Sequence, residues 1–193
     1  MPKSSATARA RKIKLILFDV DGVLTDGKIW IFPAPAGSPQ SGAQPGVSLI
    51  EAKGFHAHDG TAIMLARMAG IKTGIITKRL SETVALRARD LKIDHVYQGI
   101  QDKASVVAQI LEKDGITAAE AAFVGDDVID LPAMHQCGLA IAVKNARPEV
   151  KAAAHWVTSH AGGDGAARDA VEYILKAQGK WKQVVEEYVS LTS

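Results

Sequence analysis

The sequence predicts an α/β protein, a Rossmann-like three-layer sandwich built on a mainly parallel central sheet. First, short apolar runs alternate with segments of helical periodicity along most of the chain, which is typical of β-α-β crossovers. Second, the run IKLILFDV at 13–20 is continuously apolar up to its final acid, which favours a strand buried on both faces. Third, 193 residues of which 47% are hydrophobic suffice for the core of one globular domain.

Short apolar runs indicate the strands of this sheet in chain order. We expect them at 13–20, 71–77, 94–98, 121–125, 139–143 and 155–158. Apolar periodicity indicates helices at 59–70, 81–91, 102–113, 128–136, from 148 onward, and 166–177. Ser81 is a typical N-cap, and Gly70 and Gly115 are typical helix stops. Pro132 and Pro148 lie near helix starts, where proline is tolerated.

One stretch breaks this alternation. Two strand-like runs, 29–32 and 47–52, flank a loop at 33–46 that contains four prolines, so we expect a projecting β-hairpin insertion over about 29–52. The alternative for the loop tip is an insertion without a role. The α/β domain then covers 13–178, after a flexible basic arm at 1–12. Residues 179–193 form an amphipathic tail that docks either on its own domain or on a neighbouring subunit.

Charge and composition exclude several classes of protein. The net charge is +2 and much of the basic excess lies in the arm, so no broad basic face supports nucleic-acid binding. No uncharged apolar run approaches the roughly 18 residues of a membrane span. Cys137 is the single cysteine, so an internal disulfide is excluded and a reducing, cytoplasmic setting is favoured. We interpret it as a small buried residue rather than a nucleophile.

Polar side chains follow four of the predicted strands. They are Asp19 and Asp21 after the first, Thr77 after the second, Lys103 after the third, and Asp126, Asp127 and Asp130 after the fourth. The carboxyl ends of parallel strands meet at one edge of a sheet, where ligands bind, so we expect these side chains to gather there. Clustered carboxylates need a cation, and a site with few oxygen ligands suits Mg²⁺ together with a substrate phosphate.

This residue set points to phosphoryl transfer. A carboxylate such as Asp19 can attack phosphorus to form an aspartyl-phosphate, and a second such as Asp21 can protonate the leaving oxygen and then activate water. A lone D-x-D or GDD sequence is more often structural or only metal-binding. The order of all four elements, each at a predicted strand end, favours the catalytic interpretation.

These segments resemble the four motifs of the haloacid dehalogenase-like phosphatases. The matching stretches are DVDGVLTDG, IITKR, the segment around Lys103 and VGDDVID, and the resemblance extends over about 13–178. A longer series is similar to the 3-deoxy-D-manno-octulosonate 8-phosphate phosphatases: LFDVDGVLTDGKI, FHAHDG, HVYQG, GDDVIDLPAM, AVKNARPEV and AGGDGA. The resemblance implies a Mg²⁺-dependent phosphomonoesterase that acts on a small phosphorylated sugar acid during lipopolysaccharide precursor synthesis.

The resemblance also implies a role for each matched residue. Asp19 would be the nucleophile and a metal ligand, and Asp21 would be the general acid and base, with its backbone carbonyl on the metal. Asp126 would complete the protein ligands of the metal. Thr77 and Lys103 would hold the phosphoryl group. The supporting acids would be Asp127 and Asp130.

The spacing of the motifs leaves no room for a folded cap domain. Asp19 and Thr77 are 58 positions apart, partly used by the hairpin, and Thr77 and Lys103 are 26 apart. The resemblance is therefore to the capless class, and it implies a homotetramer in which the hairpin and neighbouring chains cover the site. A cover of this kind would exclude bulk water from the aspartyl-phosphate step.

The sequence departs from the family pattern near the expected substrate opening. His58 stands where the family has Arg before the DG pair, Lys78 where it has Gly after the motif-two Thr, and Asp164 where it has Arg in GGRGA. These changes leave the phosphatase residues intact and concern the identity of the substrate. The candidate substrate contacts are His58, Asp59, Lys78 and Arg79.

Three alternatives stay open at this point. A phosphatase of another sugar or nonulosonate phosphate would use the same residues. A receiver-type phosphorylation switch also combines an acid pair, a hydroxyl and a lysine, but its phosphoacceptor follows a later strand. A scaffold subunit would keep the fold without the chemistry, although all the residues of the four motifs are retained.

Overall fold

The predicted parallel sheet is confirmed by a computed structural model that describes residues 5–34 and 49–191. Its six strands lie in the order β5-β4-β1-β6-β7-β8, and each neighbouring pair is parallel. The strands are β1 (Leu15–Phe18), β4 (Lys72–Ile76), β5 (His95–Tyr97), β6 (Ala121–Gly125), β7 (Leu139–Ala142) and β8 (Trp156–Val157). All residues of β1, β6 and β7 are buried, as expected for strands covered on both faces.

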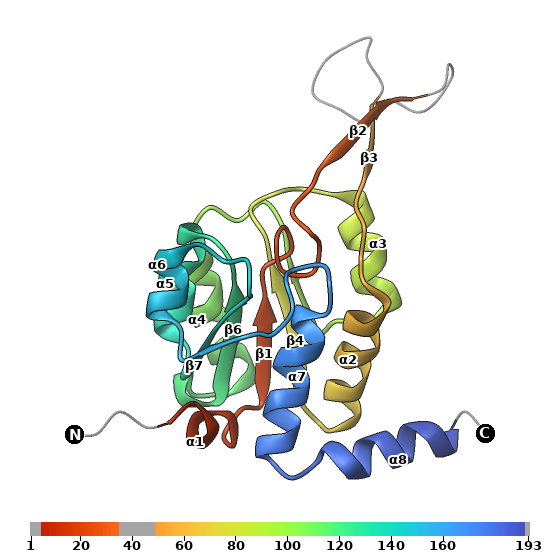
Figure 1. Cartoon of the computed structure of the whole chain (residues 1–193). Helices are drawn as coiled ribbons and strands as arrows, with labels where there is room; N and C mark the ends of the chain where they lie inside the picture. Colours follow the sequence, from red (N-terminus) through yellow and green to blue (C-terminus); the bar gives the residue numbers. More distant parts are fainter. Residues whose placement is uncertain (1–4, 35–48, 192–193) are drawn as a thin grey trace.

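Helices cover both faces of the sheet, which completes the three-layer sandwich (Figure 1). One layer contains α2 (Ala57–Met68), α3 (Glu82–Asp90) and α7 (Ala166–Ala177). The other contains α4 (Lys103–Asp114), α5 (Leu131–Gln136) and α6 (Pro148–Ala153). Right-handed crossovers produce this division, because the chain moves from β1 toward β5 and then crosses β1 to reach β6. The reversal between β1 and β6 is the switch point at which such sheets bind ligands.

The predicted hairpin consists of β2 (Trp30–Pro33) and β3 (Leu49–Ala52), which pair antiparallel and project from the domain (Figure 1). Its apolar side chains remain exposed, with Trp30 54% and Ile31 57% accessible. Residues 35–46 of the predicted loop lie outside the described residues, as do residues 47 and 48 of the predicted second strand. Between β1 and β4 the described residues form this hairpin and α2, and no separate cap domain.

The part of the arm that the structure describes is helical and packs on the domain. Ala6–Ala10 forms a short helix, α1, capped by Ser5. Ala10 is fully buried, Arg9 Nη1 donates to the carbonyl of Gly138 over 2.6 Å, and Thr7 pairs with Tyr173. Tertiary contacts of the arm with α7 and with the loop before β7 therefore overcome its weak local signal.

Two 3-10 turns and the C-terminal helix complete the fold. The predicted helix 128–136 divides into a 3-10 turn, η2 (Val128–Asp130), and α5, because Asp127 and Asp130 form a capping box around the turn. A second 3-10 turn, η1 (Ala118–Glu120), precedes β6. The tail forms α8 (Trp181–Leu191), which packs on α2 and α7 of its own domain, at the end away from the hairpin (Figure 1). Within the described ranges, no helix is long and apolar enough to cross a membrane.

Candidate active site

The parallel sheet brings the motif residues to one edge. Asp19 directly follows β1 and Asp126 directly follows β6, which are neighbouring strands with paired registers. Thr77 follows β4 on the other side of β1, and Lys103 is the first residue of α4. The edge is therefore assembled from four segments that are far apart in the sequence, as the strand-end argument predicts.

A buried lysine lies between two carboxylates at the centre of this edge. Lys103 Nζ is 2.8 Å from Asp19 Oδ1 and 2.7 Å from Asp130 Oδ1, and the three side chains are at most 6% exposed. Burial by itself would lower the pKa of Lys103, but the charges of Asp19 and Asp130 outweigh it and raise that pKa above its ordinary value. Lys103 is thus held as a cation, which is the form that binds a phosphoryl group.

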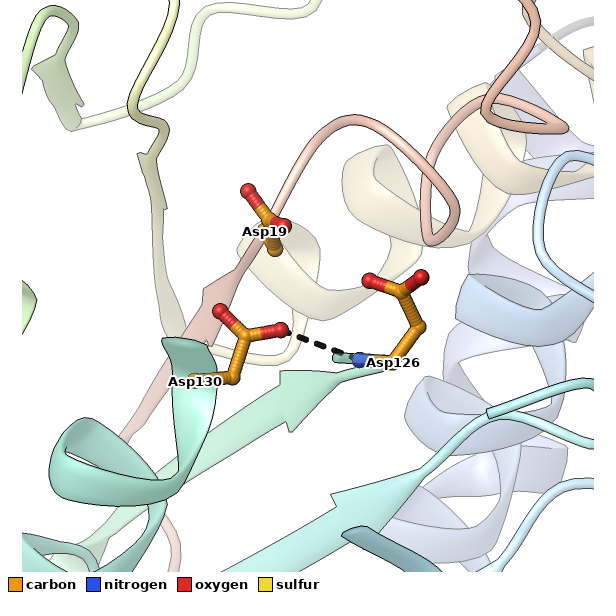
Figure 2. A group of neighbouring side chains, drawn as sticks. All are labelled: Asp19, Asp126 and Asp130. Carbon is orange, nitrogen blue, oxygen red and sulfur yellow. Dashed lines mark hydrogen bonds between the residues drawn. The ribbon is translucent and has the colours of Figure 1, made fainter. Parts of the chain in front are cut away.

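Asp130 orders the neighbouring acids rather than facing outward. Its Oδ2 accepts the backbone N–H of Asp126 over 3.0 Å (Figure 2). The same oxygen accepts the backbone N–H of Asp127 over 3.3 Å, while Oδ1 accepts Lys103 Nζ. The Asp127 carboxylate instead accepts the N–H of Val128 over 2.7 Å at the start of η2. Of the two expected supporting acids, Asp130 therefore contacts the lysine and Asp127 caps its own turn.

The carboxylates also fit a divalent cation. Oxygens of Asp19, Asp126 and Asp130 lie within 4.8 Å of one another, and Figure 2 shows these three side chains around a common space. Asp126 Oδ1 is buried without a hydrogen-bond partner, which leaves it available as a ligand. A Cβ on Gly22 would meet the Asp126 carboxylate, so the backbone after Asp21 closes against it. An all-oxygen set with few protein ligands suits Mg²⁺, and carboxylate oxygens of Asp19 and Asp126 are placed where they could hold it.

The pKa values of these acids reflect the same crowding. Burial, followed by the charge of Asp130, raises the pKa of Asp19 to about 6. Burial, followed by the charges of Asp130, Asp19 and Asp127, raises the pKa of Asp126 to about 7. The protein therefore disfavours the full set of negative charges by itself, and a bound cation would relieve this repulsion.

Asp21 has a charged partner that the sequence argument missed. Lys53, just beyond β3, forms an ion pair with Asp21 Oδ1, and its side chain is fully buried. Arg79 Nε lies 3.9 Å from Asp21 Oδ2. The position of Lys53 after a hairpin strand was a weak signal, because no strand end of the main sheet carries it.

Thr77 is buried at the same edge of the sheet, directly after β4. It is 2% exposed, and its backbone N–H donates to the carbonyl of Tyr97 over 2.9 Å. Its Oγ1 accepts the N–H of Arg79 over 3.4 Å. The turn after β4 thus fixes this hydroxyl at the same edge as Asp19, while the adjoining Lys78 is exposed.

The candidate substrate contacts are not gathered in one place. Asp59 is 3% exposed, and its Oδ1 accepts the N–H of Arg168 at the start of α7 over 2.8 Å. Burial raises the pKa of Asp59, and this carboxylate links α2 to α7. His58 is exposed and its ring packs edge-on against His56. Arg79 is exposed but near Asp21, so it remains the candidate with a contact to the catalytic edge.

The C-terminal AGGDGA stretch packs on the loop after β1. Gly163 donates its N–H to the carbonyl of Val23 over 3.0 Å, and Gly162 donates to Asn145 Oδ1 over 2.9 Å. A Cβ on Gly162 would overlap the Gly22 carbonyl, so only glycine permits this approach. The exposed Asp164 lies next to this contact.

Comparisons with known proteins agree with this geometry. A family model described as haloacid dehalogenase-like hydrolase matches residues 61–168. The chain is 39% identical over 173 residues to the 3-deoxy-D-manno-octulosonate 8-phosphate phosphatase KdsC of Escherichia coli K12, which covers 90% of this chain and 85% of the relative. The corresponding enzyme of Yersinia pestis is 37% identical over 172 residues, covering 89% and 84%.

Solved structures show the same likeness. The 3-deoxy-D-manno-octulosonate 8-phosphate phosphatase of Moraxella catarrhalis, in complex with a magnesium ion, a phosphate ion and a KDO molecule, superposes with a TM-score of 0.83 at 34% identity. The superposition covers 95% of this chain and 97% of the Moraxella catarrhalis chain. A cobalt-bound deoxy-D-mannose-octulosonate 8-phosphate phosphatase of Haemophilus influenzae gives a TM-score of 0.76 at 35% identity, covering 90% and 93%.

Proposed function

Because the chain belongs to the haloacid dehalogenase-like hydrolases, we propose that it is a Mg²⁺-dependent phosphomonoesterase in which Asp19 is the nucleophile. The observation that carries this proposal is the shared edge at which Lys103 Nζ lies 2.8 Å from Asp19 Oδ1 and the orphaned oxygen of Asp126 lies close by. When bound, Mg²⁺ would supply positive charge against the phosphoryl oxygens.

The residues divide the reaction into two steps. The Asp19 carboxylate attacks phosphorus, the bond from phosphorus to the ester oxygen breaks, and Asp21 gives its proton to that oxygen. Asp21 then takes a proton from water, whose oxygen attacks the aspartyl-phosphate and releases inorganic phosphate. Lys103 and Thr77 hold the phosphoryl group in both steps, because their donors face the same edge.

For the substrate we propose 3-deoxy-D-manno-octulosonate 8-phosphate, hydrolysed to 3-deoxy-D-manno-octulosonate and phosphate. The names of the relatives that match most of the chain support this choice. The exposed Lys78 and Arg79, next to the phosphate-binding Thr77, supply cations for a sugar-acid carboxylate. Phosphates of other sugars or nonulosonates are the competing substrates, since His58 and Asp164 depart from the family pattern.

We also propose that the protein is a cytoplasmic homotetramer. The hairpin exposes apolar side chains on a projecting element, and an exposed apolar patch of this kind supports self-association. The single cysteine, Cys137, is buried and unpaired, which supports a reducing compartment. Light scattering would measure the assembly, and a monomeric mass would contradict it.

Phosphate release from a panel of sugar phosphates, with 3-deoxy-D-manno-octulosonate 8-phosphate included, tests the function. We expect turnover that requires Mg²⁺ and a preference for the sugar-acid phosphate. Asp19→Asn should abolish turnover with the fold intact, whereas the matched change Asp26→Asn, at an exposed acid paired with Lys28, should leave it unchanged. A stable phosphoryl group on the protein would indicate a receiver, and no release from any substrate would indicate a scaffold.

A further inference from the structure

A buried cation beside Asp21 has no part in the reaction as described so far. The side chain of Lys53 is 0% exposed, although it lies at the base of the projecting hairpin. Its ammonium group forms an ion pair with Asp21 Oδ1 and lies 3.9 Å from Glu51 Oε1. Burying a lysine is costly unless it is paired, so these carboxylates account for its position.

Glu51 fixes the hairpin base, and with it Lys53, to the start of α3. Glu51 Oε1 accepts the hydroxyl of Ser81 over 2.5 Å, and Oε2 accepts Arg79 Nη2 over 3.3 Å. The hydroxyl of Thr83 donates to the backbone carbonyl of Glu51 over 3.3 Å. These three contacts hold one end of β3 on the domain, so Lys53 approaches Asp21 from a fixed direction.

Asp21 needs such a constraint to act as an acid. It lies in the loop after β1, its side chain is 20% exposed, and a short carboxylate there can rotate toward solvent. A general acid works only within hydrogen-bond reach of the leaving oxygen, and small displacements cost large factors in rate. The Lys53 contact to Oδ1 removes that freedom on one side of the carboxyl group and leaves Oδ2 toward Arg79.

We propose that Lys53 is a positioning residue that holds the Asp21 carboxyl group for proton transfer to the leaving oxygen, with Glu51 fixing Lys53 in turn. The inference rests on the proposed phosphatase function. It assigns the hairpin a role within its own subunit, in addition to any contact with other chains: its base orients the acid–base residue.

The proposal has a consequence that a purely structural role lacks. Departure of an alkoxide, as from a sugar phosphate, requires a proton from Asp21, whereas p-nitrophenolate leaves without one. Displacing the Asp21 carboxyl group should therefore slow the hydrolysis of alkyl phosphates more than that of p-nitrophenyl phosphate. The quantity to compare is kcat/KM, because it reports the steps up to departure of the leaving group and omits hydrolysis of the aspartyl-phosphate.

The experiment measures kcat/KM with Mg²⁺ for glycerol 3-phosphate, the best sugar phosphate of the panel and p-nitrophenyl phosphate. Lys53→Met keeps the apolar stem and removes the charge. The control Lys28→Met removes an exposed cation that lies just before the hairpin and pairs with Asp26. For Lys53→Met we expect a loss of at least about tenfold with the alkyl phosphates and less than about threefold with p-nitrophenyl phosphate. Lys28→Met should match the wild type on all substrates.

A second variant distinguishes a loss of positioning from a loss of folding. Glu51→Gln keeps oxygen and nitrogen atoms at the Ser81 and Arg79 contacts but removes the charge beside Lys53, and we expect the same selectivity with a smaller loss. Equal losses on alkyl and aryl substrates, or none, in variants with wild-type circular dichroism would overturn the proposal. Wild-type protein that hydrolyses neither kind of substrate would instead contradict the phosphatase function itself.

Discussion

Asp130 provides a quantitative test of how the catalytic edge is held together. Its fully buried carboxylate accepts Lys103 Nζ over 2.7 Å and the backbone N–H groups of Asp126 and Asp127 over 3.0 and 3.3 Å. Asp130→Ala removes all three interactions at once. Lys103 keeps its contact with Asp19, so the lysine is left half-paired rather than isolated.

The size of the effect follows from these contacts. Deleting one partner of a buried ion pair costs about 3–5 kcal/mol, and the remaining Asp19 contact favours the lower end of that range. The N–H groups of Asp126 and Asp127, which lose their acceptor, together add about 1 kcal/mol. Relief of the repulsion between Asp130 and the other two acids offsets a similar amount. We expect a net loss of about 3 kcal/mol, or a Tm lower by about 6–12 °C for a chain of 193 residues.

Urea unfolding followed by circular dichroism would measure this loss in metal-free protein. The matched control is Asp127→Ala, the neighbouring acid whose carboxylate only caps η2 through the N–H of Val128. We expect the control to lose about 1 kcal/mol or less. An Asp130→Ala protein as stable as this control would refute the interpretation of Asp130 as the residue that orders the edge.

Two further predictions concern the metal and the loop contact. Burial and neighbouring carboxylates raise the pKa of Asp19 to about 6 and that of Asp126 to about 7, above the ordinary value of 3.8. Metal-free protein should therefore lose stability as the pH rises from about 4 to about 7, because the folded state must give up protons that the unfolded chain has already lost. The gain in Tm on adding Mg²⁺ should therefore grow between about pH 5 and about pH 8, and a gain that does not change with pH would contradict the metal assignment. Gly162→Ala should lower kcat by about tenfold or more, because its Cβ would displace the Gly22 carbonyl beside the catalytic loop. Gly54→Ala, where a Cβ meets nothing within 4 Å, should behave as wild type in the same assay.

The sequence predicted those features that depend on hydrophobic periodicity along the chain and on the general rules of parallel sheets. Continuous apolar runs identified the buried strands, and the rule that parallel strands share a carboxyl edge predicted that Asp19, Thr77 and Asp126 would meet there. The hairpin followed from its two runs and proline-rich loop. These inferences need only the period of hydrophobic residues and the handedness of crossovers, both of which are local or universal.

The contacts of Lys53 and Asp59 could not be predicted, because they depend on which elements pack against each other in the folded protein. The ion pair of Lys53 with Asp21 exists because the hairpin base docks on α3, and no spacing in the sequence encodes that docking. The burial of Asp59, a candidate substrate contact, likewise depends on the packing of α2 on α7, which places its carboxylate against the N–H of Arg168.

The chain by itself determined the order of strands and helices and the set of acids that end near one another, since hydrophobic periodicity and chain direction act along the backbone. Only the tertiary structure decided which charges pair, because burial and distance to partners from remote segments set the cost of each ionised group. The tertiary structure alone decided that Asp130 pairs with Lys103. It also decided that the arm at Ala6–Ala10 packs on α7.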